Sequence, residues 1–496
     1  MTTIDHRDVQ TETFEVHNPG TGELVGLHPI HDETHVRAAV DRARVAADWW
    51  QGLGFEGRRK RLDAFRGVIA RRINQLAGVI NEEMGKPHSD AVLEIALVLD
   101  HIAWAGKSAP KVLKSRRVPS GAMAAHLAAR VEYRPLGVVG VIGPWNYPVF
   151  TPMGSIVYAL AAGNTIVFKP SEFTPAVGAW LVNAFGEVVP EHPVFQLITG
   201  DGATGAALCR AGVDKLAFTG STATAKKVMA SCAQTLTPVV AECGGKDALL
   251  GAEDANLEAA ADAAVWAGMA NAGQSCIGVE RVYVHESVYD RFEQIVRDKV
   301  EGLRAGSDPA ALLGPITMAS QVAIINRHVQ DALDRGGRVL AGAVDVEGQV
   351  VQPLVLVDVP EDSDAVREET FGPTFTLRKV KSMQEAVDLT NATNYGLAGS
   401  VFSKRHGREI ASGIRSGMVS INSVFSFAMV PSVPFGGVGE SGFGRIHGAD
   451  GLREFCYPRS EVRQRFKAPL ALTTLTRTPA TDERLGKIIA LVHGSK

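Results

Sequence analysis

A cysteine that follows an alanine-rich stretch and stands among glycines is the residue best suited to chemistry. Cys276 lies within residues 271–278, where glycines and small polar residues let the backbone approach a ligand closely. A thiolate is a strong nucleophile, so we expect Cys276 to attack a carbonyl carbon. Cys209, Cys232 and Cys456 lack such neighbours, and for them a role as small hydrophobic side chains is favoured.

Two further side chains can complete that chemistry. Glu242 ends an apolar, strand-like run, where burial would raise the pKa of its carboxyl toward neutrality and make it a base for water. Asn146 stands between prolines in residues 144–148, and its amide could join the backbone N–H of Cys276 in holding an oxyanion. Taken singly, Glu242 could be a surface residue at a strand end and Asn146 part of a structural turn.

Polar residues at two other predicted strand ends suggest a dinucleotide site. Ligands of parallel sheets gather at the carboxyl ends of strands, where Ser221 at a helix start can meet a phosphate and Lys169 and Glu172 can bind ribose hydroxyls. Because Glu172 would repel a 2′-phosphate, NAD is favoured over NADP. Ordinary polar strand ends are the alternative interpretation.

The elements that must position these residues form an α/β pattern. Apolar residues are spaced as in helices from about residue 36 to 106. After residue 135 the pattern changes to short β-branched runs that alternate with helical stretches. Strands of a first parallel sheet are expected at 138–142, 165–168, 194–198, 215–218 and 238–241. A long helix at 259–270 and strands at 281–285, 374–380, 400–402 and 419–422 indicate a second α/β domain.

Three segments stand outside this alternation. Residues 116–134 are typical of an extended hairpin, and the chain after residue 455 is again strand-like, so the two could pair across a subunit boundary. Residues 482–493 place apolar side chains at helical spacing. For this amphipathic tail, packing against the body of the protein is favoured over contact with a membrane.

Composition limits the class of protein. A chain of 496 residues with a formal net charge of −3 should form two or three domains and gives no reason to expect a nucleic-acid partner. Residues 1–10 are polar, unlike a secretion signal, and no run of about 18 apolar residues occurs, so a cytoplasmic protein without a transmembrane segment is expected. The five cysteines form no CxxC pair, and neither disulfides nor a metal site is predicted.

Taken together, the segments resemble the large NAD(P)-dependent aldehyde dehydrogenase superfamily over nearly the full chain. The segments that carry this resemblance, in order, are 144–148, 168–172, 218–222, 240–246 and 271–278, with further agreement at 368–373, 394–397 and 434–445. Each fragment alone is a weak signal. Their joint order makes the resemblance specific.

The resemblance implies a role for each matching residue. Cys276 would be the nucleophile, Glu242 the general base and Asn146 the oxyanion donor. The residues implied in cofactor binding are Trp145, Lys169, Ser171, Glu172, Gly220, Ser221, Gly244, Glu369 and Phe371, and those implied in the substrate pocket are Tyr147 and Phe435. Among them, Lys169 and Glu172 would hold the adenosine ribose, Ser221 the pyrophosphate, and Glu369 with Phe371 the nicotinamide riboside.

The resemblance also implies the fold and its division into domains. A Rossmann-like NAD(P)-binding domain would span residues 1–115 and 137–243, and an α/β catalytic domain residues 244–445. Residues 116–136 and 456–470 would form a small β oligomerisation arm, followed by a C-terminal tail at 471–496. A homodimer or homotetramer is the expected assembly.

Departures from the family pattern refine these expectations. Ser155 stands nine residues after Asn146, where many members carry a lysine, so a proton relay through that lysine is in doubt. Ala225 replaces a glycine at a helix start, and Cys243 replaces the leucine common after the base; packing is the favoured role of Cys243. These features resemble the class 3 and coniferyl-type branch, whose members use either cofactor, so NAD is expected first and NADP as possible.

The substrate is expected to be an apolar aldehyde. Residues 423–433, expected near the pocket, contain no charged side chain, whereas the carboxylate of a semialdehyde would need an arginine or paired donors. Aliphatic or aromatic aldehydes are therefore favoured, with a semialdehyde such as succinic semialdehyde as the alternative. Glu242 disfavours a CoA-acylating enzyme, and retention of Cys276, Glu242 and Asn146 together disfavours a non-catalytic relative.

Overall fold

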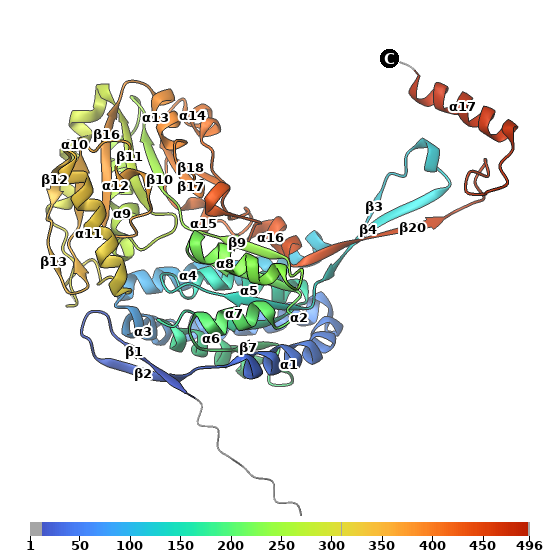
Figure 1. The fold of residues 1–496 in the computed structure, drawn as a ribbon, viewed down its shortest axis with the longest axis horizontal. Coiled ribbons are helices and arrows are strands. Elements are labelled where there is room, and N and C mark those ends of the chain that lie inside the picture. The colour runs from blue at the N-terminus through green and yellow to red at the C-terminus, as the bar shows by residue number, and fades with distance from the viewer. Residues whose placement is uncertain (1–11, 309, 495–496) are drawn as a thin grey trace, which may run out of the picture.

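The computed structural model describes residues 12–308 and 310–494. Two α/β bodies lie side by side, and a thin arm projects from one of them (Figure 1). The prediction of two α/β units joined to a β arm is confirmed, whereas the polar start at residues 1–10 lies outside the described residues.

The described part of the chain begins with a hairpin and four helices, and the helices agree with the helical spacing of apolar residues in the sequence. Their bounds are β1 (Thr13–His17), β2 (Leu24–Pro29), α1 (Glu33–Gly52), α2 (Gly54–Arg71), α3 (Ile73–Met84) and α4 (His88–Leu113). The Asp32 side chain caps α1 by accepting from the backbone N–H of His35. Gly85 ends α3 in the left-handed conformation, at φ 67°, which glycine adopts without steric cost. This turn directs the chain toward the functional site.

The first sheet has six strands in the order β19-β9-β8-β5-β6-β7, all parallel except β19. Its strands are β5 (Val138–Ile142), β6 (Thr165–Lys169), β7 (Phe195–Leu197), β8 (Lys215–Thr219), β9 (Val239–Glu242) and β19 (Gly442–Phe443). The crossover helices are α5 (Phe150–Ala162), α6 (Pro175–Val188), α7 (Gly202–Arg210) and α8 (Thr222–Ala233). The strands carry almost wholly buried apolar runs, as expected for a parallel sheet covered on both faces.

The second sheet has seven strands in the order β12-β15-β16-β11-β10-β17-β18. They are β10 (Asp247–Gly251), β11 (Val279–His285), β12 (Arg338–Gly342), β15 (Leu354–Val357), β16 (Thr374–Val380), β17 (Ala398–Phe402) and β18 (Met418–Ile421). The longer helices around it are α9 (Leu257–Met269), α10 (Glu286–Val300), α11 (Ala319–Asp334), α13 (Met383–Thr390) and α14 (Gly407–Gly413). Shorter elements are β13 (Val346–Glu347), β14 (Val350–Val351), α12 (Asp364–Arg367), α15 (Ser426–Met429) and the 3₁₀ turns η1 (Ala122–Ala124), η2 (Ala270–Gly273) and η3 (Gly439–Ser441).

The chain returns to the first sheet after β18. Strand β19 pairs antiparallel with β9, so that Gly442 lies opposite Glu242 and Phe443 opposite Ala241. Helix α16 (Gly448–Glu454) then packs against α4 and α5. Residues 442–454 therefore lie with the first sheet, although the second sheet separates them from it in the sequence.

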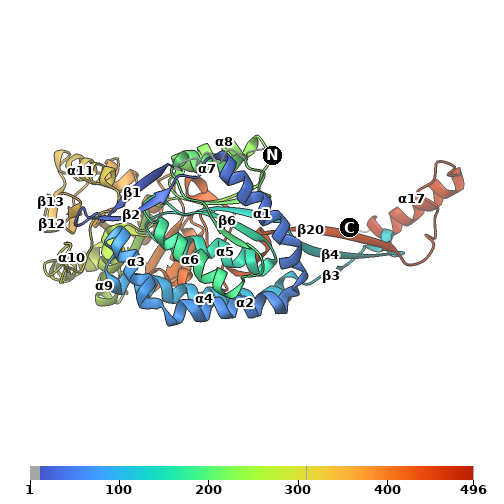
Figure 2. The same cartoon turned by 90° about the horizontal axis from the view of Figure 1, so that it is seen from below.

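The arm is a three-stranded antiparallel sheet that stands away from both bodies (Figures 1 and 2). It combines β3 (Arg116–Val118), β4 (Leu127–Pro135) and β20 (Cys456–Gln464), in which Cys456 pairs with Pro135 and Gln464 with Leu127. The two segments expected to leave the α/β order thus pair with each other in one chain. Their exposed faces leave the sheet available to a second subunit.

The tail helix α17 (Pro479–His493) forms as the sequence predicts but does not pack where predicted. It lies beyond the arm, and none of its residues is buried (Figure 1). The expectation that it packs against the body is wrong for a single chain, because the amphipathic spacing specifies a helix but not the surface that covers it. Among the residues that the structure describes, no helix is long and apolar enough to cross a membrane.

Candidate active site

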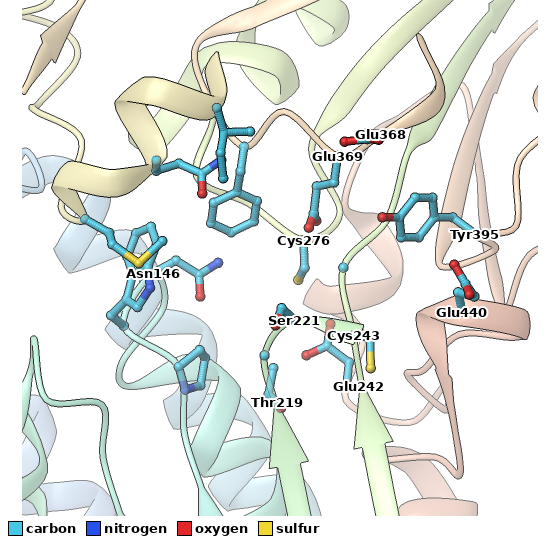
Figure 3. Close-up of a pocket in the computed structure, with 18 of the residues that line it drawn as sticks. Asn146, Thr219, Ser221, Glu242, Cys243, Cys276, Glu368, Glu369, Tyr395 and Glu440 are labelled. Atoms are coloured by element: carbon cyan, nitrogen blue, oxygen red, sulfur yellow. The ribbon is translucent and has the colours of Figure 1, made fainter. Parts of the chain in front are cut away.

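Two cavities meet beside the carboxyl ends of the first sheet. The larger, of about 540 Å³, is walled by the ends of β5, β8 and β9 on one side and by residues of the second body on the other (Figure 3). The smaller, of about 170 Å³, lies among α4, α5, α9 and α15. Cys276 belongs to the walls of both cavities. Any group bound in one cavity therefore faces the other across this thiol.

The loop before Cys276 is held in a costly backbone conformation. Asn271 and Ala272 both have φ of 54°, a left-handed value that non-glycine residues rarely adopt and that costs of order 1–3 kcal/mol each. Gly273, at φ 71°, approaches the backbone of Gly372 so closely that a Cβ would overlap its carbonyl. Strain of this kind persists where surrounding contacts fix it, and here it turns Cys276 toward the cavities.

Glu242 lies at the end of β9, 3% exposed and directed at Cys276 (Figure 3). Neither oxygen of its carboxylate has a hydrogen-bond partner within the described residues. Burial raises the pKa of Glu242 to about 7, against smaller lowering effects of the neighbouring Cys276 and Thr219 side chains. A carboxylate with this pKa, facing a cavity, is suited to accept a proton from water near neutral pH.

The Cys276 thiol is only partly buried as a residue, yet its sulfur lies among carboxylates. Burial raises the pKa of Cys276 well above its usual value, and the negative charge of Glu242 raises it further, as does that of Glu369. The free protein therefore holds a neutral thiol. Deprotonation of that thiol needs either a base in contact, which Glu242 supplies, or a positive charge brought into the larger cavity.

Asn146 is fixed at the end of β5 by contacts to the Cys276 loop. Its side-chain Nδ2 donates to the carbonyl of Gln274 at 3.0 Å, while its own carbonyl accepts from Asn271 Nδ2 at 3.0 Å. Asn146 also lines the larger cavity. An amide nitrogen carries two hydrogens, so the second remains available to an oxygen near Cys276.

The second body contributes a carboxylate to the larger cavity. The backbone N–H of Gly245 donates to Glu369 Oε1 at 3.0 Å, and a Cβ at Gly244 would overlap this carboxylate. Burial raises the pKa of Glu369 well above its usual value. Gly244 is thus required for the close approach of β9 and Glu369.

A buried carboxylate supports the strained turn that follows Glu369. Phe371 has φ of 54°, and Glu280 accepts from the backbone N–H groups of Thr370 at 2.8 Å and Phe371 at 2.9 Å. Lys246 forms an ion pair with Glu280. The Phe371 ring then meets Trp145 edge to face, with ring centroids 5.6 Å apart, so aromatic rings close this side of the cavity.

The residues predicted to hold a dinucleotide fall into two groups. Gly220 and Ser221 line the larger cavity, and the Ser221 side chain caps α8 by accepting from Thr224 N at 3.3 Å, which leaves a helix N-terminus facing the sheet edge. Lys169 ends β6, the neighbour of β5, and Ser171 and Glu172 come directly after it; none of the three lies in either cavity wall. Lys169 Nζ lies 3.8 Å from Glu172, and burial lowers the pKa of Lys169.

The smaller cavity is mostly apolar. Its wall consists of Asp90, Leu93, Glu94, Leu97, Tyr147, Phe150, Thr151, Trp266, Ala270, Ser275, Cys276, Ile277, Phe425, Ala428, Met429, Phe435 and Ile446. The two predicted substrate residues, Tyr147 and Phe435, are therefore both present. No lysine, arginine or histidine stands in this wall among the described residues.

Sequence reasoning did not identify several wall residues. In the larger cavity these include Thr219, Gln321, Arg327 and Arg367, and Tyr395 and Glu440 enter it from segments that were noted only as family-like. In the smaller cavity, Asp90 and Leu93 come from α4, where the helical spacing indicated packing alone. A charged residue on the apolar side of an amphipathic helix was the available signal for Asp90.

One further cluster has the composition of a metal site. The ligand atoms of His328, Asp364 and Glu368 lie within 4.8 Å of one another. Arg327, however, donates to Glu368 at 2.9 Å and lies 3.6 Å from Asp364. A guanidinium already neutralises these acids, so the cluster is explained as an ion-pair network.

The larger cavity fits a nicotinamide dinucleotide by its own contacts. It combines a capped helix N-terminus for a phosphate, a carboxylate fixed by a backbone N–H, and an aromatic edge, all facing one thiol. The residues that would hold such a group are those predicted for it at the ends of β6, β8 and β9 together with Glu369 and Phe371.

Comparison with known proteins agrees with this geometry. The model of the aldehyde dehydrogenase family matches residues 6–460. A 4,4′-diapolycopene aldehyde oxidase of Methylomonas sp. is 36% identical over 92% of this chain and 87% of its own length, and a glutarate-semialdehyde dehydrogenase of Pseudomonas putida is 32% identical over 90% and 93%. Among solved structures, PnpE in complex with nicotinamide adenine dinucleotide matches with a TM-score of 0.88 and 32% identity, covering 94% of this chain and 96% of that one.

The family model spans nearly the whole chain, and relatives above 30% identity cover about nine-tenths of it. The solved relative covers 94% of this chain, so the match is not confined to one body. The chain therefore belongs to the aldehyde dehydrogenase family and is an NAD(P)-dependent aldehyde dehydrogenase.

Proposed function

We propose that this enzyme oxidises apolar aliphatic or aromatic aldehydes to carboxylic acids, with Cys276 as nucleophile, Glu242 as general base and Asn146 as oxyanion donor. The observation that carries the proposal is the position of Cys276 in the walls of both cavities. A thiol between a dinucleotide-sized cavity and an apolar pocket can join an aldehyde on one side while that carbon faces a hydride acceptor on the other.

The residues divide the reaction into two halves. Glu242 or water takes the thiol proton, and the Cys276 sulfur adds to the aldehyde carbon while the Asn146 amide and the Cys276 backbone N–H hold the oxyanion. A nicotinamide cofactor bound in the larger cavity would supply the hydride acceptor. Glu242, once any thiol proton has passed to solvent, takes a proton from water, whose oxygen attacks the thioester carbon. The acid is released, and the departing Cys276 sulfur takes up a proton to restore the thiol.

The charges of the smaller cavity support an apolar aldehyde. Its acidic wall residues are Asp90 and Glu94, and Glu94 is already paired with Lys86, with Nζ and Oε2 2.5 Å apart. A semialdehyde carboxylate would find no cation in this wall and would face Asp90. Burying an unpaired carboxylate costs several kcal/mol.

NAD is the proposed first cofactor, with NADP also used. Glu172, 44% exposed in its side chain, stands where an adenosine ribose is expected and would repel a 2′-phosphate. Lys169 lies 3.8 Å from Glu172 and offsets part of that repulsion. The ratio of kcat/KM with the two cofactors measures this balance, and we expect it to favour NAD.

An aldehyde panel tests the substrate class. Hexanal, benzaldehyde and succinic semialdehyde are compared by reduced-cofactor absorbance, with each cofactor in turn and with and without CoA. We expect kcat/KM for hexanal or benzaldehyde to exceed that for succinic semialdehyde at least tenfold, which corresponds to about 1.4 kcal/mol. Equal or better turnover of the semialdehyde would establish the alternative substrate class, and a rate that depends on CoA would refute hydrolysis by Glu242.

A further inference from the structure

A buried ion pair outside the proposed catalytic set contacts the Asn146 loop. Lys86 follows the left-handed turn at Gly85, and Glu94 lies on α4. Both side chains are fully buried, and Lys86 Nζ lies 2.5 Å from Glu94 Oε2. The pair comes from the first helical layer, so its contact with the site depends on tertiary structure alone.

The pair holds both ends of residues 146–150. Lys86 Nζ donates to the backbone carbonyl of Asn146 at 2.7 Å. Glu94 Oε1 accepts from the backbone N–H groups of Val149 at 2.8 Å and Phe150 at 2.9 Å, at the start of α5. Lys86 Nζ also lies 4.0 Å from the centroid of the Tyr147 ring. Hydrogen bonds from Lys86 and to Glu94 therefore fix the segment that carries Asn146 on both sides of its turn.

The same segment is tied to the loop of the nucleophile. The Asn146 carbonyl accepts from Asn271 Nδ2 as well as from Lys86, and the backbone N–H of Asn271 donates to Asp90 Oδ2 at 3.2 Å. Because the Asn146 amide donates to Gln274, only two residues before Cys276, a rotation of the Asn146 peptide would move its side chain relative to the sulfur.

Stability alone gives a poor account of this arrangement. A buried ion pair pays a large desolvation cost, and well-packed apolar residues of the same volume often give equal or greater stability. What charges supply that apolar groups cannot is a directed hydrogen bond to a carbonyl. An oxyanion donor must stand within a few tenths of an ångström of its productive position to be effective.

We infer that Lys86 and Glu94 are positioning residues that orient Asn146 as the oxyanion donor. The inference rests on the proposed role of Asn146. It assigns to the loop before α4 and to the first turns of α4 a function in the acylation half of the reaction. It predicts that loss of the pair slows formation of the thiohemiacetal and the hydride transfer that follows, without weakening cofactor binding.

A double-mutant cycle tests the inference. Wild type, Lys86→Met, Asn146→Ala and the double variant are mixed with saturating NAD and hexanal, and the rate constant of the first NADH turnover is measured. Saturation removes effects on aldehyde affinity through Tyr147. We expect Lys86→Met to slow this step about 5- to 50-fold, with the Kd for NAD within about twofold of wild type. The double variant should be no slower than Asn146→Ala.

A matched control separates positioning from general stability. Lys215 begins β8, at the strand end opposite the site, and forms a comparable pair with Glu454 at 2.5 Å. Lys215→Met should lower the unfolding temperature and leave the first-turnover rate constant of the folded enzyme unchanged. Glu94→Gln, which keeps the shape and an acceptor, enters the same cycle and decides the question if Lys86→Met does not fold.

The outcomes distinguish failure of this inference from failure of the proposed role of Asn146. In the first, Asn146→Ala lowers the first-turnover rate constant, and adding Lys86→Met or Glu94→Gln lowers it again by the same factor as in the wild-type background. The pair then acts independently of Asn146, and this inference alone is overturned. If Asn146→Ala keeps the wild-type first-turnover rate constant, the proposed role of Asn146 is overturned, and the inference with it. A slow Lys215→Met enzyme would show that loss of any buried pair slows the step, which also overturns the inference.

Discussion

At the scale of single residues, the proposed chemistry depends on a carboxylate, Glu242, whose oxygens have no hydrogen-bond partner within the described residues. Glu242 ends a strand whose neighbours satisfy its backbone, so that the side chain alone faces the cavity. Such a group costs stability when it is ionised. Active sites often contain residues of this kind, because the environment that destabilises the charge also makes the group a stronger base.

The pH dependence of deacylation follows from this environment. The pKa of Glu242 is raised to about 7, and the base acts in its deprotonated form. Under conditions where thioester hydrolysis limits turnover, kcat should therefore fall as pH drops below about 7 and level off about one unit above it. Steady-state kcat with saturating hexanal and NAD from pH 5.5 to 9 measures this. A profile that is flat between pH 6 and 8 would show that another group is the base.

Removal of the carboxylate should separate the two halves of the reaction. Glu242→Gln keeps the side-chain size and leaves Cys276 in place, so hydride transfer to NAD should still occur once per active site. Hydrolysis should slow by a factor on the order of 10²–10⁴. Stopped-flow absorbance would record a burst of reduced cofactor followed by a very slow phase. Cys276→Ala should show neither phase, and a Glu242→Gln enzyme with wild-type turnover would contradict the assignment.

The three catalytic candidates could be named from sequence because their signals are local. Glycines around Cys276, prolines around Asn146 and the apolar run before Glu242 are all visible within a few residues of each. Lys86 and Glu94 could not be found in this way. Their partners stand about 55 to 60 positions away, and in the sequence both resemble ordinary charged residues near a helix start.

At the scale of elements, short turns are held by buried carboxylates rather than by their own hydrogen bonds. Glu280, on β11, supports the strained turn at Thr370 and Phe371 and pairs with the buried Lys246. This turn also places Glu369 in the wall of the larger cavity. One side chain therefore connects the stability of the second sheet to the shape of the site.

Replacement of Glu280 should be strongly destabilising. Glu280→Ala removes the acceptor of two backbone N–H groups and leaves Lys246 buried without a counter-charge, which typically costs about 3–5 kcal/mol. Urea denaturation followed by tryptophan fluorescence measures the loss. Glu258, an exposed partner of Lys299 at 3.5 Å, provides the matched surface control, and Glu258→Ala should cost less than about 1 kcal/mol. Equal losses in the two variants would show that Glu280 has no special role.

Strands could be predicted from the sequence where their run of apolar residues had clear ends. The five predicted strands of the first sheet and the arm segments have β-branched runs with clear ends, and they form within a few residues of the predicted bounds, whereas β19 was not predicted. Strands β10, β12 and β15 were not predicted. Strand β10 is short and wholly buried, so it shows neither alternation nor a contrast with the apolar helices around it.

At the scale of the whole molecule, the arm presents apolar side chains to solvent. Strand β20 exposes Tyr457 and Val462, which are 46% and 59% exposed. Exposed apolar strands of this kind are typical of subunit contacts. We expect the enzyme to be a homodimer or homotetramer that associates through this arm.

A charge on the arm should weaken the assembly. Val462→Asp places a carboxylate on the exposed face of β20, opposite Ala129 in the arm sheet. Sedimentation velocity should show wild type as a dimer or tetramer and the variant shifted toward monomer. Leu27→Asp, at a side chain 60% exposed on β2, which lies far from the arm in Figures 1 and 2, should leave the assembly unchanged. A monomeric wild type, or an unaffected Val462→Asp assembly, would refute the role of the arm.

The pairing of Gly442 with Glu242 has a consequence for biosynthesis. The strand that ends in Glu242, the proposed general base, has an open edge until residues 442 and 443 are synthesised, two hundred positions later. The whole second sheet must be translated in between. A nascent chain therefore exposes the Glu242 carboxylate, which is buried in the folded enzyme, and an unpaired strand edge while about two hundred residues are added. We therefore expect the surroundings of Glu242 to form only near the end of translation, in the same step in which α16 packs against α4 and α5. They should not form earlier, when the rest of the first domain folds.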